Sequence, residues 1–256
     1  YMPYPSTKAM KADGQRYDKP WLEPTGANYL SLNGTWKLRW SEGAKPVLLG
    51  KDDFWGDNVS TDGSAWNDIT VPSCLEMNGY GLPMYVNVDY PFEDQQPYVR
   101  MKAGLKNSVG SYRRDFTLPV GWENKRVFLH FDGIYSAAYV YVNGNEVGYT
   151  EGANNVSEFD ITKYLRTGKN NVAVQVIRWS DGSYLEGQDM WHMSGIHRDV
   201  YLVATPKTYL ADHYIKATVT PGSTTAATGS AATSVDLTVC NRDKTAAKKT
   251  ITVTLF

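Results

Sequence analysis

Short runs of alternating apolar and polar residues, separated by turn residues, constrain this 256-residue chain more than any other feature of its sequence. Such period-two runs are typical of half-buried β-strands, whereas an amphipathic helix repeats every 3.6 residues. The runs lie at residues 35–40, 110–118, 126–131, 139–142, 171–179 and 199–203. Asn143-Gly144 stands between apolar runs and is the strongest short-range signal for a β-hairpin. Because only residues 161–165 and the region near Met190 look helical or turn-like, the sequence predicts an all-β protein.

The spacing of these runs predicts the domain organisation. Many short strands joined by long loops suit a jelly-roll β-sandwich, which we place at residues 29–206. Residues 1–28 are polar and rich in Pro, Gly and Lys, and we interpret them as an N-terminal arm with little structure of its own. Residues 207–256 turn to Thr-rich β runs, at 214–219, 234–240 and 250–256. Three strands are too few for a sandwich, so we expect the first strands of a truncated second domain and a chain that is a fragment of a longer protein.

The charge balance and the cysteines exclude several classes of function. The chain has 26 basic and 27 acidic side chains, which argues against binding to nucleic acid or to anionic membranes. No run reaches the roughly 18–20 apolar residues that a membrane helix needs. Cys74 and Cys240 are too few for a disulfide scaffold, and we expect two ordinary thiols. The sequence has no CxxC or HExxH pattern, so it makes no case for a zinc site.

The stretch from Arg178 to Asp199 holds the densest set of function-capable groups in the chain. It leaves a strong predicted strand and enters a long loop, where binding residues tend to lie. Carboxylates and amides bond sugar hydroxyls, and indole faces pack on the apolar faces of a pyranose ring. The loop therefore suits a sugar, although Asp181-Gly182 taken alone favours a plain turn.

Other side chains of this loop have competing interpretations. Glu186 and Asp189 form a candidate hydrolytic carboxylate pair, but adjacent loop carboxylates are far more often solvated. His192 and His197 lack the spacing of metal ligands, which favours surface or hydrogen-bonded histidines.

Two further features carry a weaker signal. Trp179 and Trp191 are candidate stacking platforms, yet tryptophans of this kind more often belong to the core. Residues 77–92 form a Gly/Pro-rich loop that carries Asn87 and Asp89 between aromatic residues. Alone, this segment favours an ordinary loop-capping role for Asn87.

Seven motifs follow one another along the predicted sandwich. They are Ser31–Trp36 (SLNGTW), Val71–Ser73 (VPS), Met84–Pro91 (MYVNVDYP), Phe131–Ala137 (FDGIYSA), Val142–Tyr149 (VNGNEVGY), Ser157–Asp160 (SEFD) and Arg178–Ile196, which contains RWSDGSY, DMW and MSGI. In this order they resemble the N-terminal part of the glycoside hydrolase family 2 enzymes, specifically the large β-galactosidases.

This resemblance implies a fold and a division of labour. It implies a galactose-binding-domain-like jelly roll, followed from near Thr208 by the start of an immunoglobulin-like β-sandwich. In the family, a barrel follows these domains and carries two carboxylates that perform retaining hydrolysis, one as acid/base and one as nucleophile. Neither carboxylate lies in these 256 residues, so we expect no catalytic residue here and no activity from the fragment alone.

The resemblance also implies substrate-binding residues. Asn87 matches the family's Asn that contacts galactose, and Asp181 matches the Asp that touches galactose hydroxyls and helps to hold a sodium ion. That metal role for Asp181 needs partners from the absent barrel, and magnesium is a further cofactor of the full-length enzyme, whereas none is expected in the fragment. Tyr184 and Trp191 are expected to support the loop. His192 stands where the family often has a basic residue, which puts side contacts of the loop in doubt.

Several functional alternatives stay open at this point. The preferred hypothesis is a sugar-binding fragment with a β-galactoside and its own C-terminal barrel as partners, and a homo-oligomer at full length. The chain is alternatively a lectin-like carbohydrate-binding module, a structural domain that packs on the barrel, or part of a β-glucuronidase or β-mannosidase of the same family. The Asn87 and Asp181 motifs together favour galactose. We expect a soluble protein of the cytoplasm or periplasm.

Overall fold

The computed structural model describes residues 4, 6–14, 19, 26–43, 54–87, 89–221, 229–243, 245 and 248–253. The described residues are mostly β-strands, which confirms the predicted fold class. None of their helices is long and apolar enough to cross a membrane. Within the described part of the N-terminal arm, Thr7–Ala12 forms the short helix α1, where we expected little structure. The Ser6 hydroxyl caps it by accepting a hydrogen bond from the backbone nitrogen of Ala9.

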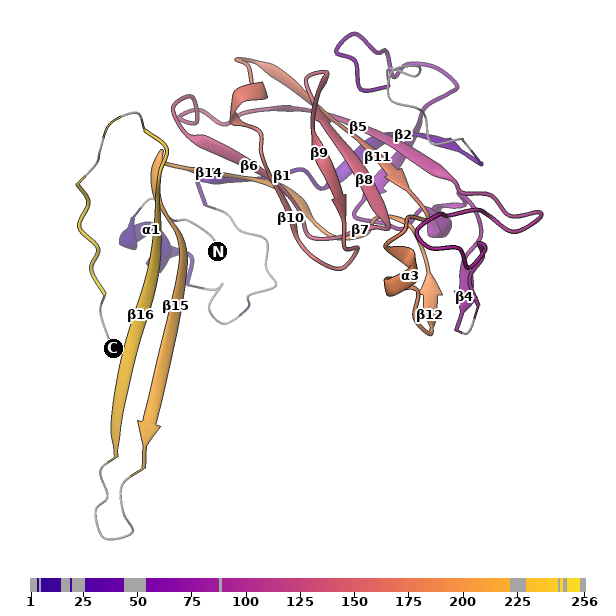
Figure 1. The fold of residues 1–256 in the computed structure, drawn as a ribbon. Helices are drawn as coiled ribbons and strands as arrows, with labels where there is room; N and C mark the ends of the chain where they lie inside the picture. Colours follow the sequence, from indigo (N-terminus) through magenta and orange to yellow (C-terminus); the bar gives the residue numbers. More distant parts are fainter. Residues whose placement is uncertain are drawn as a thin grey trace.

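The larger of two main sheets has six antiparallel strands and runs through the middle of the molecule (Figure 1). In spatial order the strands are β3 (Asn67–Val71), β2 (Gly34–Ser41), β5 (Val109–Thr117), β11 (Lys169–Ile177), β8 (Ala137–Val142) and β9 (Asn145–Glu151). The β8–β9 connection is the hairpin predicted at Asn143-Gly144. Both residues have positive φ, 49° and 77°, which Asn and Gly tolerate better than other residues.

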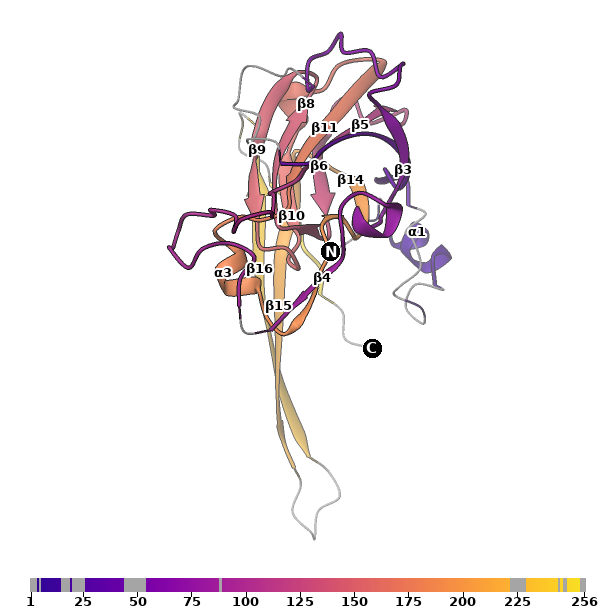
Figure 2. The ribbon, with the colours of Figure 1, turned by 90° about the vertical axis from the view of Figure 1, so that its right-hand side faces the viewer.

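The second main sheet has four antiparallel strands and packs against the first. In spatial order the strands are β1 (Tyr29–Ser31), β14 (Val200–Thr205), β6 (Arg126–Phe131) and β10 (Ser157–Asp160). Figure 2 shows the two layers from the side. The 3-10 turn η2 (Thr162–Tyr164) follows β10 where the sequence predicts a helical or turn-like segment.

The core lies between the two sheets. Trp36 and Val174 from the larger sheet and Leu129 and Leu202 from the smaller one are all at most 1% exposed and belong to one apolar cluster. Alternation along each strand turns one set of side chains to the facing sheet, as in β6, where every second residue is buried. Each fully buried Leu or Val stabilises the fold by about 1.5–3 kcal/mol.

Smaller elements extend one end of the sandwich. Two short ladders pair β4 (Met84–Val86) with β12 (Met190–His192) and β7 (Ile134–Tyr135) with β13 (Gly195–Ile196). The 3-10 turn η1 (Glu76–Asn78) and the short helix α3 (Ser183–Glu186) lie in the same loops. The predicted helical or turn-like region near Met190 is wrong for Met190 itself, which pairs as strand β12, although α3 precedes it.

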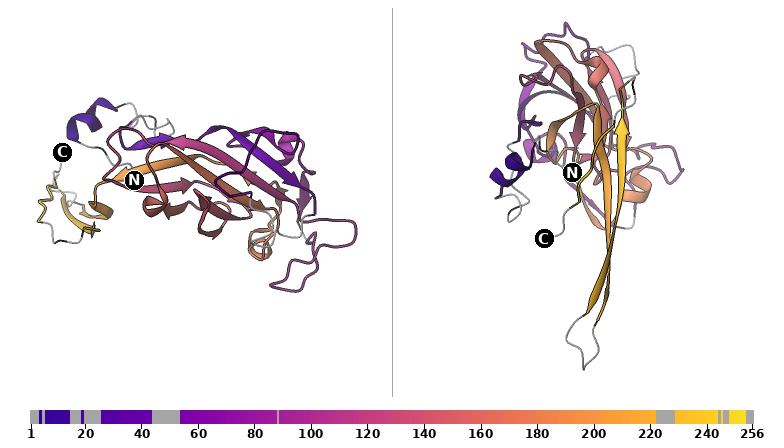
Figure 3. Two further views of the ribbon diagram at one scale, coloured as in Figure 1. Left: turned by 90° about the horizontal axis from the view of Figure 1, so that it is seen from above. Right: turned by 90° about the vertical axis from the view of Figure 1, so that its left-hand side faces the viewer.

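A long hairpin projects beyond the sandwich (Figure 3). It consists of β15 (Thr208–Thr220) and β16 (Ser230–Asn241), which contain the strands predicted at 214–219 and 234–240. The strand predicted at 250–256 is wrong in its described part, since residues 250–253 have no regular structure, and residues 254–256 lie outside the described residues. The assignment of this hairpin to an immunoglobulin-like domain stays a prediction. Cys74 and Cys240 are both free, as expected.

Candidate functional site

Two loops that are about 100 residues apart in sequence meet at one end of the sandwich. The β4–β12 ladder pairs Tyr85 with Trp191 and Val86 with Met190, and Asn87 directly follows the last residue of β4. Figure 1 shows β4, β12 and α3 together at this end, beyond the last residue of β11. The ladder thus brings the loop that carries Asn87 to the loop that carries Asp181.

Asp181 and Asn87 are both exposed, as side chains that contact a ligand must be. Asp181 opens the turn into α3, where its carbonyl oxygen accepts a hydrogen bond of 3.1 Å from the backbone nitrogen of Tyr184. The turn expected for Asp181-Gly182 therefore exists, and it leaves the Asp181 carboxylate at the surface. Turn geometry and ligand contact are compatible interpretations of this residue.

Glu151 lies beside Asp181 and was missed by sequence reasoning. The pKa of the Glu151 carboxyl is raised, first by burial and then by its hydrogen bond with Asp181 and the repulsion between the two carboxyl groups. The hydrogen bond from the Tyr149 hydroxyl to Glu151 acts in the opposite direction and lowers this pKa. Thr150-Glu151-Gly152 has the pattern of an ordinary strand end, so the sequence gives no signal for the contact between Glu151 and Asp181. The two carboxylates concentrate negative charge at this point of the surface.

Exposed aromatic rings accompany these polar groups. Tyr85 is 52% exposed and Trp191 is 56% exposed, and their rings meet edge to face with centroids 5.7 Å apart. The Tyr85 hydroxyl also donates a hydrogen bond to Asp189. The more common expectation for Trp191, a place in the core, is therefore wrong, whereas Trp179 is 3% exposed and is a core residue. Exposed indole and phenol faces are suited to stacking on a sugar ring.

Tyr184 supports the loops from within. Its ring packs with Phe92 and Trp179 in a small apolar cluster. Its hydroxyl lies 2.6 Å from the carbonyl oxygen of Glu93 and 3.0 Å from that of Tyr98, which share its single proton, and it accepts a hydrogen bond from the backbone nitrogen of Gln95 (3.1 Å). The supporting role expected for Tyr184 agrees with these contacts, which fasten the 92–101 loop to α3.

A buried ion pair anchors both ends of the Asp181 loop. Glu76, with a fully buried side chain, accepts hydrogen bonds of 2.7 Å from both the backbone nitrogen and the hydroxyl of Ser194. Its carboxylate lies 3.4 Å from Nε of Arg178, whose side chain is 8% exposed. Arg178 in turn donates to the Leu82 carbonyl oxygen at 2.6 Å. Burial lowers the pKa of Arg178, and the Glu76 carboxylate opposes that effect.

The remaining candidates of the loop have structural partners. His192 is buried, its Nδ1 lies 2.9 Å from the Tyr135 hydroxyl, and its Nε2 lies 3.2 Å from the Gln188 carbonyl oxygen. Glu186 accepts a hydrogen bond of 2.9 Å from the backbone nitrogen of Ala153, whereas Asp189 bonds Tyr85. Glu186 and Asp189 thus have separate partners, which gives no support to a catalytic pair. Burial lowers the pKa of His197.

The oxygen ligands that this chain offers a cation are incomplete. Carboxylate oxygens suit a hard ion such as sodium, and Asp181 and Glu151 present two such groups side by side. In the part of the chain that the structure describes, no three His, Cys, Asp or Glu residues lie together as a metal site. The residues present therefore fit part of a sodium site, and further ligands would have to come from another part of the protein.

A β-sandwich with exposed carboxylate, amide and aromatic groups gathered at one loop end has the features of a carbohydrate-binding domain. The profile of "Glycosyl hydrolases family 2, sugar binding domain" matches residues 29–206. The chain belongs to this family.

Relatives and solved structures agree with that assignment. The chain is 42% identical over 192 residues to a β-galactosidase of Priestia megaterium, a match that covers 75% of this chain and 18% of the relative. It is also 42% identical over 190 residues to a β-galactosidase of Streptococcus thermophilus, a match that covers 73% of this chain and 18% of that relative. A Bacteroides uniformis β-glucuronidase structure superposes with a TM-score of 0.55 at 25% identity, covering 75% of this chain and 20% of that one. A Bacteroides vulgatus β-glycosidase shares the fold, with a TM-score of 0.59 at 21% identity, covering 85% and 25%. The chain thus spans less than a fifth of the length of the curated relatives it matches.

Proposed function

We propose that this chain is the sugar-binding part of a β-galactosidase and lends Asp181 and Asn87 to an active site that a C-terminal barrel completes. The observation that carries the proposal is the β4–β12 ladder, which brings the two loops together at one exposed end. The 42% identity to proteins named β-galactosidase supports galactose as the sugar.

The two residues have different chemical roles in this proposal. The exposed Asp181 carboxylate accepts hydrogen bonds from galactose hydroxyls, and with Glu151 it offers oxygen ligands to a sodium ion. The Asn87 amide both donates and accepts, which suits a hydroxyl. These groups supply binding energy, while proton transfer and nucleophilic attack belong to carboxylates of the barrel. The fragment alone is therefore expected to be inactive, and a magnesium ion would be held by residues outside it.

The same end of the sandwich also offers an apolar surface to the rest of the protein. Met77 is 71% exposed, Leu82 77% and Leu185 82%, on loops that flank the candidate site. Exposed large apolar side chains are typical of an interface when they lie on neighbouring loops. Docking of the barrel on these loops would cover them and bring its carboxylates to the sugar held by Asp181. Homo-oligomer formation at full length stays part of the proposal.

A substitution in the full-length protein tests the role of Asp181. Loss of charged hydrogen bonds to two hydroxyls removes about 3 kcal/mol of transition-state stabilisation, so Asp181→Asn is expected to lower kcat/KM for a β-galactoside on the order of 100-fold. Asp94→Asn, in the neighbouring exposed loop, is the matched control and should leave kcat/KM unchanged. An Asp181→Asn enzyme with the wild-type kcat/KM would refute the proposed contact. Comparing wild-type kcat/KM for a β-galactoside and a β-glucuronide separates the two family activities.

One observation favours a second candidate, a lectin-like binding module. The exposed pair of Tyr85 and Trp191 provides a stacking surface within this chain alone. Titration of the 256-residue chain with galactose, followed by tryptophan fluorescence, tests it. Saturable binding that Trp191→Ala abolishes supports the lectin, whereas the absence of a Trp191-dependent response supports a half-site that needs the barrel. We expect no Trp191-dependent response, since one loop face gives few convergent polar groups.

A further inference from the structure

A polar cavity lies on the outer face of the six-stranded sheet, far from the Asp181 loop. Its volume is about 540 Å³, within the range of roughly 300–1,000 Å³ that is typical of small-molecule sites. It opens between β2, β5, the first residues of β11 and the 57–62 loop. The cavity is at Lys169, where β11 begins, and the candidate site follows Ile177, where β11 ends. A strand of this length separates the two by roughly 27 Å.

Aromatic packing fixes the wall of this cavity. The Trp55 ring stacks on Tyr141 with centroids 4.9 Å apart, and Phe54 meets Tyr141 edge to face at 5.7 Å. The guanidinium of Arg39 lies 5.2 Å from the centre of the Trp66 ring. These contacts hold both ends of the 54–66 loop against the sheet, so the cavity exists before any ligand arrives.

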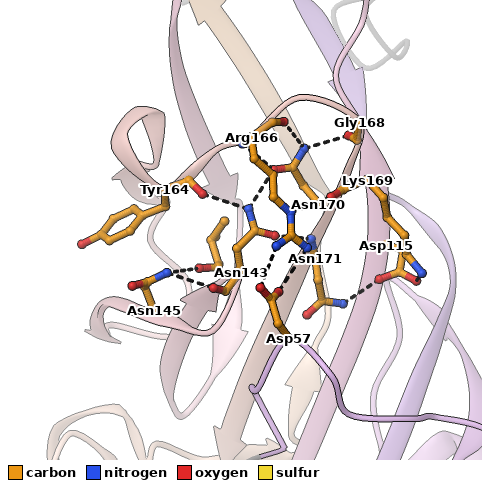
Figure 4. Close-up of polar contacts among 11 residues, drawn as sticks. Asp57, Asp115, Asn143, Asn145, Tyr164, Arg166, Gly168, Lys169, Asn170 and Asn171 are labelled. Carbon is orange, nitrogen blue, oxygen red and sulfur yellow. Dashed lines mark hydrogen bonds and ion pairs between the residues drawn. The ribbon is translucent and has the colours of Figure 1, made fainter.

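The floor of the cavity carries an unused hydrogen-bond acceptor. Asn171 is 5% exposed, and its amide nitrogen donates to Asp115 Oδ1 at 2.9 Å, as Figure 4 shows. The same nitrogen donates to the Arg114 carbonyl oxygen at 3.2 Å. Its Oδ1 is buried and has no hydrogen-bond partner among the described residues. Leaving a buried acceptor unpaired is costly, and a ligand hydroxyl is a suitable donor. Arg113, 4% exposed, also lines the cavity, and its guanidinium donates a hydrogen bond to the Phe54 carbonyl oxygen.

Three ion pairs lie at the opening of the cavity, and the guanidinium groups of Arg113 and Arg114 donate to backbone carbonyl oxygens. Arg166 binds Asp57 through two bonds of 2.6 and 3.2 Å, as Figure 4 shows, and Lys169 lies 2.7 Å from Asp115. Lys37, on the neighbouring strand, is similarly paired with a carboxylate. An anionic ligand would therefore meet carboxylates as well as cations. A neutral ligand with several hydroxyls donates to the carboxylate and amide oxygens and accepts from the guanidinium groups.

We propose that this cavity is an accessory binding site for a neutral carbohydrate, distinct from the galactose contacts of Asp181 and Asn87. The fixed wall, the unpaired Asn171 oxygen and the paired charges together carry the proposal. It goes beyond the proposed function, because an accessory site would hold the enzyme to a longer glycan or to a second sugar unit without taking part in hydrolysis.

Titration of the ¹⁵N-labelled 256-residue chain with lactose, followed by NMR, tests the site. Thr35 is exposed and lines the cavity, so Thr35→Trp adds a bulky indole ring to its lining. Thr70→Trp is the matched control, since Thr70 is the exposed cross-strand partner of Thr35 and lies outside the cavity lining. A dispersed spectrum reports that each variant is folded. Asp181→Ala separates this site from the proposed galactose contacts.

The site is supported if lactose causes saturable shifts of the Asn171 and Lys169 resonances that persist in Thr70→Trp and in Asp181→Ala. In Thr35→Trp the affinity for lactose obtained from these shifts should be at least tenfold weaker. The proposal is overturned if lactose causes no saturable shifts at these residues, if Thr35→Trp binds as well as Thr70→Trp, or if inorganic phosphate binds there and lactose does not. Loss of the shifts in Asp181→Ala also overturns the proposal of an accessory site. The two proposals are tested separately, because an unchanged kcat/KM of the full-length Asp181→Asn enzyme would refute the galactose contact and leave these shifts as they are.

Discussion

Replacing Glu76 by Ala tests whether a buried ion pair holds the candidate loop in place. The variant leaves the Arg178 charge buried without its carboxylate, which typically costs about 3–5 kcal/mol. Two hydrogen bonds from Ser194 are lost as well. Arg178 retains its bond to the Leu82 carbonyl oxygen and its place 5.3 Å from the Trp179 ring centre, which limits the loss. We expect the free energy of unfolding to fall by about 4 kcal/mol.

Urea unfolding of five proteins measures this effect. They are the wild type, Glu76→Ala, Glu76→Leu, Arg178→Met and the variant that combines Glu76→Leu with Arg178→Met. The double variant removes both charges together, so it should be more stable than the sum of the single losses predicts, by about 2 kcal/mol or more. Hydrogen exchange should quicken in residues 178–194, because the anchored ends of the loop are released. A loss below about 1 kcal/mol in Glu76→Ala, or a coupling near zero, would refute the reasoning.

Three further predictions concern the same end of the sandwich. Tyr184→Phe removes the hydroxyl that three backbone groups contact and should cost about 1–3 kcal/mol, with faster proteolysis of the 92–101 loop. Gly195→Ala should destabilise by at least about 2 kcal/mol in urea unfolding, since φ is 121° and a Cβ would lie 2.9 Å from a backbone oxygen. Glu151 has a raised pKa in the folded protein, so the stability of the wild type falls as pH rises from 4.5 through that pKa. Glu151→Gln cannot lose this proton, so its stability should depend less on pH above 4.5.

Each of these predictions has a control or a contradicting result. Gly63→Ala has a positive φ of 133° but open space around it, so it should cost less than Gly195→Ala, and equal losses would contradict the steric argument. Unchanged proteolysis of Tyr184→Phe would show that ring packing alone holds the loop. For Glu151→Gln, urea midpoints measured from pH 4 to pH 8 should rise relative to wild type toward neutral pH. Parallel curves would contradict the raised pKa, and Glu146→Gln, exposed on the same strand, is the control.

Local signals in the sequence predicted much of the sandwich. The runs at 35–40 and 126–131 fall on strands, and those at 110–118 and 171–179 overrun the ends of theirs by one and two residues. They were found because alternation of apolar residues reports which side chains face the core. Asn143-Gly144 predicted its hairpin because the turn needs two residues that tolerate positive φ. Such features depend on neighbouring residues alone.

The candidate site was predicted only in part. The loop from Arg178 to Asp199 and the segment with Asn87 were found from their composition and from the resemblance to glycoside hydrolase family 2. Their meeting through β4 and β12 was not found, because three-residue strands have no readable period. Trp179 and Trp191 illustrate the limit, since one is buried and the other exposed although the same loop carries both.

The sequence by itself determined the all-β class, the strand positions and the family, because periodicity, turn chemistry and motif order are local properties of the chain. Only the tertiary structure placed Glu151 beside Asp181, paired Glu76 with Arg178 and left the Asn171 oxygen unpaired in a cavity. These contacts join residues about 30 to 100 positions apart, or depend on how a loop covers a sheet. Their energies arise from burial and from the distance between charges, which exist only once the sheets have packed.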